Sequence, residues 1–518
     1  MKAIKYIKKI AGVAALCLGV YSCTSDFEKI NTDPNNVSSE TLTNTAQLLT
    51  QVQRHSFVEA RFNTWRGNLI FGGRFAEQFS FSFAGTWFGN GLGFSYDRVD
   101  WNDAAWDTPF AEVSAPLAEL LKLTGEGGRL QDDCANAVVK VIKGFFYQRM
   151  TDIFGAVPYV EGGLGGIPKF ESQQEVYTMI MQDLSTAIAK LKTCGGTIDG
   201  IAEGDLVYEG DSEKWLAAAN TLLLRMALRS KEANGGNQAI IDEALQGPFI
   251  ASSADNFQIA QDPSNADAVF NGYYDIWHTF QGCCGNAASW VASETLVESF
   301  KANNDPRLFG FAMPVDGGTA GVWDDYRGAK VAAKAAYAAA NVFESFSKPN
   351  ERMWNDESFA YITMTYAEAQ LLQAEAKYAT NLGEAQMHFE NAIRANGQTW
   401  DADSALVDAY IANEASAQLS ATADVAMQQI GLNRWYAAYT NGYESWSVMR
   451  RFDLDIFPDK TFTANNDWAD TTGGVSNQMG KRLNYSQATK SQNPDAVQYA
   501  ISVQGPDLYT TRLWWDVN

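Results

Sequence analysis

Apolar side chains recur with helical spacing along most of the chain. In segment 134–147, Ala135, Val138 and Ile142 fall on one stripe, at intervals of three and four residues that bring side chains to one face of an α-helix. Segment 178–191 repeats this pattern. Segment 215–228 is apolar around most of its circumference, which predicts a buried helix. The chain is therefore predicted to be predominantly helical.

A further helix pair is predicted at 366–379 and 384–395, separated by a Gly-containing turn. In the second helix, Ala385, Phe389 and Ala392 keep the small–aromatic–small spacing of a tetratricopeptide repeat, although the first helix lacks the repeat's preferred Gly. The small residues let two helices approach while the aromatic ring fills the groove between them. With the other helices, this pattern predicts an α-solenoid scaffold.

Three long segments between the helices, 85–106, 255–289 and 316–353, are rich in Gly, Asn and aromatic residues and are predicted to be loops. Loops of this length in a compact domain are usually functional or disordered, and their aromatic content argues against disorder. Because no linker divides the mature chain, residues 23–518 are predicted to form one domain.

The N-terminus has the pattern of an export signal. Four lysines precede an apolar run at 10–21, and the small residue Ser22 precedes Cys23. This pattern predicts a signal peptide over 1–22. Cleavage before a cysteine further predicts a lipoprotein that begins at acylated Cys23, the alternative being an ordinary signal peptide with Cys23 in a disulfide. Residues 24–28 resemble the acidic export tag of lipoproteins displayed on the outer face of the outer membrane.

The formal charge of the 518-residue chain is −22. This excess of acid argues against nucleic acid as a partner and disfavours polyanionic ligands, but does not penalise neutral ones. Beyond residue 21 no apolar run has the length needed to cross a bilayer, so the acyl chains alone are expected to hold the protein at a membrane.

Four further cysteines are Cys134, Cys194, Cys283 and Cys284. Disulfides are compatible with export to an oxidising compartment. No Cys-x-x-Cys pair occurs and the three histidines are far apart in sequence, so no metal site is predicted. The adjacent Cys283 and Cys284 are either two buried thiols or a vicinal disulfide in a tight turn, and both interpretations stay open.

Six segments resemble, in their order along the chain, the motifs of the SusD/RagB family of outer-membrane nutrient-binding lipoproteins. They are the opening FEKINTDPN (27–35), TDIFGAVPY (151–159), NNDPR (303–307), TYAEAQ with AEA (365–376), the NRW…NG…W…RR segment (433–451) and the closing LWWD (513–516). The branch resembled most is the starch-binding branch that associates with the outer membrane.

This resemblance implies an all-α superhelix of tetratricopeptide-like helix pairs with long ligand-binding loops. It also implies display on the cell exterior and a SusC-like TonB-dependent transporter as partner. The motif residues themselves, such as Trp446, Arg450 and Trp515, are predicted to belong to the scaffold, because aromatic residues in helical and terminal segments are usually core.

A sugar-binding site combines exposed aromatic rings with hydrogen-bonding side chains, and the three predicted loops supply this mixture. The candidate ligand-binding residues are Trp87, Tyr96, Trp101, Tyr274, Trp277, Cys283, Cys284, Trp323, Tyr326 and Arg352, with Asp33 and Asn35 as secondary candidates. Each aromatic could instead pack its own loop. Arg352 could donate to sugar oxygens or pair with a nearby carboxylate.

The pattern favours capture over catalysis. Neither a nucleophile elbow, a His-Glu-x-x-His motif nor a phosphate loop occurs, and no cofactor is predicted. We therefore predict a non-catalytic lipoprotein that captures a neutral oligosaccharide. A vicinal disulfide at Cys283–Cys284 would present a small, flat surface. Such a surface would fit a compact furanose ring and favours a fructan. The alternatives are peptide uptake of the RagB kind and, less favoured, a surface glycosidase using two carboxylates.

Overall fold

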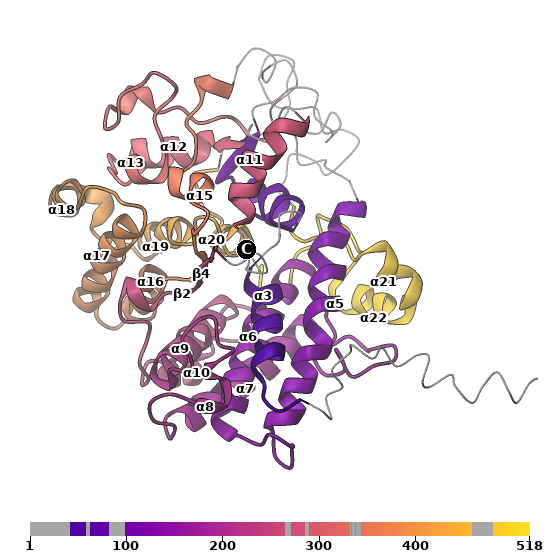
Figure 1. Cartoon of the computed structure of the whole chain (residues 1–518). Coiled ribbons are helices and arrows are strands. Elements are labelled where there is room, and N and C mark those ends of the chain that lie inside the picture. The colour runs from indigo at the N-terminus through magenta and orange to yellow at the C-terminus, as the bar shows by residue number, and fades with distance from the viewer. Residues whose placement is uncertain are drawn as a thin grey trace, which may run out of the picture. The chain divides into compact units, whose positions relative to one another are not determined.

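The computed structural model describes residues 42–58, 63–81, 99–264, 271–284, 290–331, 333, 337, 343–457 and 480–517. The chain divides into two units, Met1–Thr45 and Ala46–Asn518. All the helices and strands below belong to the second unit (Figure 1). The predicted division into a signal peptide (1–22) and one mature domain (23–518) stays a prediction.

Helices make up most of the described secondary structure, and the predicted all-α fold class is confirmed. The α-helices are α3 (Ala46–Phe57), α5 (Val99–Thr124), α6 (Asp133–Phe154), α7 (Gln173–Leu191), α8 (Asp199–Ala202), α9 (Ser212–Arg229), α10 (Gln238–Ala244), α11 (Gly272–Cys284), α12 (Glu294–Ala302), α13 (Leu308–Phe311), α15 (Glu351–Asn355), α16 (Tyr366–Lys377), α17 (Leu382–Thr399), α18 (Ser404–Asn413), α19 (Ala423–Ala437), α20 (Gly442–Phe452), α21 (Gln487–Gln492) and α22 (Pro494–Gln504). The π-helix η1 spans Thr64–Gly73, and 3-10 turns are η2 (Ser253–Asp255), η4 (Trp323–Asp325), η5 (Phe343–Ser345) and η6 (Ala415–Ala417).

The five helices predicted from periodicity are all present, as α6, α7, α9, α16 and α17. Four of them are longer than the periodic stretch, and polar caps set their starts. The Asp132 carboxylate accepts hydrogen bonds from the first backbone N–H groups of α6, and Ser172 and Glu175 form a reciprocal capping box at the start of α7. Such residues carry no apolar signal, so periodicity underestimates helix length.

Helices α16 and α17 form the predicted repeat-like pair. Ala385, Phe389 and Ala392 are all buried in a core that α16 shares with α18 and α19. The small side chains permit close helix approach and the phenyl ring fills the remaining space. The tetratricopeptide-like spacing is therefore confirmed at these three positions.

Two short antiparallel ribbons join segments far apart in sequence. Strand β1 (Phe79–Phe81) pairs with β3 (Trp290–Ala292), so that Phe79 faces Ala292. Strand β2 (Phe257–Ile259) pairs with β4 (Tyr361–Met364), with a bulge between Phe257 and Gln258.

The loop predictions need correction. Within 255–289 the structure contains β2 and the helix α11, while α5 begins inside 85–106 and α15 inside 316–353. Frequent Gly, Asn and aromatic residues obscured the helical period in these segments. Because α11 is a helix, its aromatic side chains lie on different faces of that helix. The loop prediction did not anticipate this.

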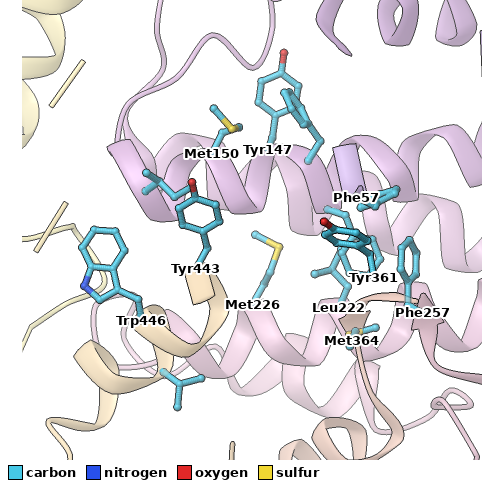
Figure 2. Packing of buried hydrophobic residues seen from close by; sticks show 14 of the residues in the cluster. Phe57, Tyr147, Met150, Leu222, Met226, Phe257, Tyr361, Met364, Tyr443 and Trp446 are labelled. Atoms are coloured by element: carbon cyan, nitrogen blue, oxygen red, sulfur yellow. The ribbon is translucent and has the colours of Figure 1, made fainter. Parts of the chain in front are cut away.

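The main hydrophobic core is rich in aromatic rings. Figure 2 shows labelled side chains from α3, α6, α9, α20 and the β2–β4 ribbon gathered in this core. The ring centroid of Phe257 lies 4.8 Å from that of Phe57 and 4.4 Å from that of Phe145. The ribbon is thus fixed against α3 and α6. No helix in the described ranges is long and apolar enough to cross a membrane.

Charged residues from three of the motif segments meet inside this core. We call them, with two arginines of α9, the buried ion network. Its members are Asp152 (α6), Arg225 and Arg229 (α9), Glu368 and Glu375 (α16), Arg434 (α19), and Glu444 and Arg451 (α20). All of them have side chains at most 11% exposed.

Arg229 lies at the centre of the network. Its guanidinium bonds to the carboxylates of Asp152 and Glu444, while Arg225 lies 2.6 Å from Glu368. Burial opposes ionisation of Glu444, but the neighbouring guanidinium groups, chiefly that of Arg225, hold its pKa below the ordinary value. The predicted scaffold role of the motif residues agrees with this arrangement.

A disulfide joins Cys134, at the start of α6, to Cys194, just beyond the end of α7. The two residues are 60 positions apart in sequence. Because α6 and α7 pack against one another, the bond links the start of α6 to the end of α7. The sequence alone did not decide this pairing.

Candidate functional site

Helix α11 has two faces of different character. Tyr273 and Trp277 are buried, each 1% exposed. One position after each, Tyr274 is half-buried and His278 is exposed. Tyr274 and His278 are four residues apart, so their side chains lie on the same side of the helix. Their rings stack with centroids 4.2 Å apart and planes 28° apart.

Helix α15 adds a third ring to this surface. The centroid of half-buried Trp354 lies 6.2 Å from that of His278, with the ring planes 30° apart. The indole N–H of Trp354 donates to the carbonyl of Pro349, at 3.2 Å, which fixes the ring orientation. We call Tyr274, His278 and Trp354 the aromatic platform.

Buried hydrogen bonds hold α11 and α15 in register. The Asn271 amide, fully buried, donates to the carbonyl oxygens of Met353 at 3.0 Å and Asp356 at 2.8 Å. On the inner face of α11, the Tyr273 hydroxyl donates to the Thr440 carbonyl at 2.7 Å and lies 2.6 Å from the Asn68 amide. The platform therefore stands on a rigid base, which limits the entropy lost when a ligand binds.

Hydrogen-bonding groups lie beside the rings. Interaction with the carboxylate of Glu357, a half-buried residue, raises the pKa of Tyr274 above its ordinary value. Flat rings pack against the C–H face of a sugar, while carboxylate and hydroxyl oxygens bond to its hydroxyls. The platform thus combines both chemistries that a sugar offers.

The structure places the candidate residues predicted from the sequence in different environments. Tyr274 lies on the platform. Trp277 does not fit the predicted stacking role because it faces the core, and Tyr326, also 1% exposed, does not fit it either. Trp323 is half-buried with its ring 4.6 Å from that of Phe309, so it packs against α13.

Arg352 pairs with a carboxylate, as one of its two predicted arrangements had it, but the partner is the distant Asp401 rather than a carboxylate beside it in sequence. Its guanidinium donates to the carboxylate of Asp401 at 2.7 Å and to the Thr399 carbonyl at 3.2 Å. The ion pair ties α15 to the end of α17. A donor role toward sugar oxygens is therefore not the one this structure presents.

Several predicted residues lie outside the described part of the chain. These are Asp33, Asn35, Trp87 and Tyr96, together with the lipid-anchor candidate Cys23. Trp101 lies in α5 and Cys283 and Cys284 end α11, but the description of these three residues is limited to the backbone. The choice between two thiols and a vicinal disulfide therefore stays open, now at the end of a helix rather than in a loop turn.

His278 and Trp354 are the platform residues missing from the predicted ligand set. A signal for His278 was present, because Tyr274 and His278 have the i, i+4 spacing of one helix face. It was overlooked because the segment was predicted to be a loop. Trp354 lies one residue beyond the third aromatic segment (316–353), and nothing in the sequence brings it next to α11.

A small cavity of about 60 Å³ lies elsewhere, beside the buried ion network. Ser56, Gln148, Tyr361 and Glu444 are among its lining residues. A cavity of this size with polar lining has room for ordered water. Across the described residues, no group of three or more His, Cys, Asp or Glu side chains is arranged to hold a metal ion.

Sequence comparison decides the family. The family described as starch-binding and associating with the outer membrane matches residues 34–485. The chain belongs to the SusD-like family. The resemblance of its motifs to SusD/RagB proteins is thereby confirmed. No curated protein sequence matches the chain.

Solved structures of SusD-like proteins superpose over nearly the whole chain. A chitin-binding protein is 26% identical, with 92% of this chain and 100% of that chain covered and a TM-score of 0.75. A chitin-binding SusD homologue from Flavobacterium johnsoniae is 22% identical (92% and 98% covered, TM-score 0.75). A SusD homologue from Bacteroides uniformis is 20% identical (92% and 99% covered, TM-score 0.77). The last two likenesses establish the fold alone.

Proposed function

We propose that this SusD-like protein is a non-catalytic surface lipoprotein that captures oligosaccharides on the aromatic platform. The observation that carries the proposal is the set of three neighbouring rings of Tyr274, His278 and Trp354, at least partly exposed and held on a hydrogen-bonded base. A family described as starch-binding supports a glycan as the ligand.

For the glycan, we propose oligosaccharides of β-linked N-acetylglucosamine. The support is the likeness to a chitin-binding protein at 26% identity over the whole of that chain. Such a ligand is neutral, so the charge of −22 does not oppose its binding. The fructan prediction rests on the Cys283–Cys284 pair alone and becomes the second glycan to be tested.

We further propose that acylated Cys23 anchors the protein to the outer membrane, facing the exterior. The support is the signal pattern of residues 1–23 and a family described as associating with that membrane. Several acyl chains on one residue give stable anchoring, whereas one does not. A captured glycan then needs a route inward, for which a SusC-like TonB-dependent transporter is the proposed partner.

Calorimetric titration of the mature protein with a panel of ligands tests the proposed function. The panel contains chitin oligosaccharides, fructan oligosaccharides, starch fragments and peptides. Saturable binding of chitin oligosaccharides, with peptides inert, is the expected result. Saturable binding of peptides only would replace the proposal with peptide uptake of the RagB kind. Hydrolysis of a bound glycan would instead indicate a glycosidase.

A further inference from the structure

We propose that the groove between α17 and α18 is a second sugar-binding subsite, which receives the far part of an oligosaccharide held on the aromatic platform. This inference rests on the proposed function, and it specifies the length of the ligand. An oligosaccharide that occupies both surfaces must be longer than a trisaccharide.

The groove has the size and the lining of a small-molecule site. Its volume of about 450 Å³ lies within the range of about 300–1,000 Å³ that is typical of ligand pockets. Buried Val407 and half-buried Ala402 form its apolar part, and exposed Gln398 and Ser404 add an amide and a hydroxyl. The groove therefore combines an apolar surface with hydrogen-bonding groups, as a sugar ring requires.

The charged groups at the groove form opposite pairs. Asp408 accepts a hydrogen bond from the guanidinium of Arg394 at 2.8 Å, and Asp401 accepts one from Arg352 of α15 at 2.7 Å. A carboxylate has about four lone-pair sites, so each aspartate can still accept from sugar hydroxyls. Because the charges of these four residues balance, the groove suits a neutral sugar although the chain carries a charge of −22.

Helix α15 lies between the platform and the groove. Trp354 belongs to the platform, while Arg352, two positions earlier, bonds to Asp401 at the groove. Residues two apart in a helix point to different sides, and Figure 1 shows α15 between α11 and the α17–α18 pair. A helix with its side chains is about 10–12 Å across, so a few sugar units bridge the two surfaces.

The side chains that α15 exposes are polar. Glu351, Arg352 and Asn355 are exposed, and the Asn355 amide donates to the Glu351 carboxylate at 3.0 Å. Sugar units that cross α15 therefore meet hydrogen-bonding groups. Occupation of the platform then holds the rest of the ligand close to the groove, which raises the overall affinity.

The test compares chitotriose with chitohexaose in calorimetric titrations of the mature protein. A hexasaccharide presents four overlapping trisaccharide stretches to a single site, which explains a gain in affinity of at most about fourfold. We expect a gain of about tenfold or more, because the hexasaccharide also reaches the groove. The double variant Gln398→Ala, Ser404→Leu removes the amide and places an apolar side chain at the groove. It should reduce the gain to the fourfold limit and leave the affinity for chitotriose unchanged, which also shows that the platform is intact.

The matched control is the double variant Ser491→Leu, Gln492→Ala, which makes the same two replacements at exposed positions of α21. It should bind both ligands like the wild-type protein. An equal loss of hexasaccharide binding in this control would overturn the inference, as would an equal loss of both ligands in the groove variant. A wild-type gain within the fourfold limit would also overturn it, while leaving the proposed function intact. Binding of neither ligand would reject both.

Discussion

Replacing Arg229 with methionine is expected to lower the free energy of unfolding by about 3–5 kcal/mol, because removal of one partner leaves buried opposite charges uncompensated. The Arg229 side chain is 0% exposed and bonds to both Asp152 and Glu444. Methionine keeps much of the length of the side chain, so the lost free energy of unfolding comes mainly from removal of the charge. Urea unfolding, followed by circular dichroism, measures it.

The matched control is Arg394→Met. Arg394 also pairs with an aspartate, Asp408, at 2.8 Å, but its side chain is 45% exposed. An exposed pair contributes about 0.2–1 kcal/mol, so this variant should unfold almost like the wild type. Equal, small losses in the two variants would contradict the structural importance of the buried ion network.

Removal of the disulfide by the double substitution Cys134→Ser and Cys194→Ser is expected to lower the free energy of unfolding by about 2–4 kcal/mol. The bond restricts the unfolded chain by closing a loop between residues 60 positions apart. Thermal unfolding with and without reductant provides the check. The wild-type protein should lose more stability on reduction than the double variant, which still carries the adjacent Cys283 and Cys284. A reductant-insensitive wild type would show that the bond does not form.

Much of the scaffold could be predicted from the sequence because its signals are local. The stripe through Ala135, Val138 and Ile142 predicted α6, and the small–aromatic–small spacing around Phe389 predicted α17. The motif residues in the described ranges belong to the scaffold, as predicted for Trp446, Arg450 and Trp515. Their meeting in one network was not predictable, because Asp152 and Glu444 are nearly 300 positions apart and only the tertiary fold brings both to Arg229.

The candidate site was predicted less well. Composition pointed to the segment around Tyr274, but ring exposure depends on which way α11 faces. A helix places Trp277 inward and His278 outward, although they are adjacent in sequence. Trp354 comes from a segment about 75 residues later, and the Asn271 bonds that align the two helices leave no trace in composition. The aromatic content of the sequence therefore identified the region of the candidate site. Only the folded geometry identified which of its residues are exposed.

Titration of Trp354→Ala with chitin oligosaccharides tests the central claim most directly. Loss of one large stacking surface should weaken binding by about 1–3 kcal/mol, or roughly tenfold, without abolishing the fold. The control Trp323→Ala removes an indole that packs against Phe309, and should lower the melting temperature while leaving affinity unchanged. An affinity of Trp354→Ala equal to that of the wild-type protein, whatever its stability, would contradict glycan capture on the aromatic platform.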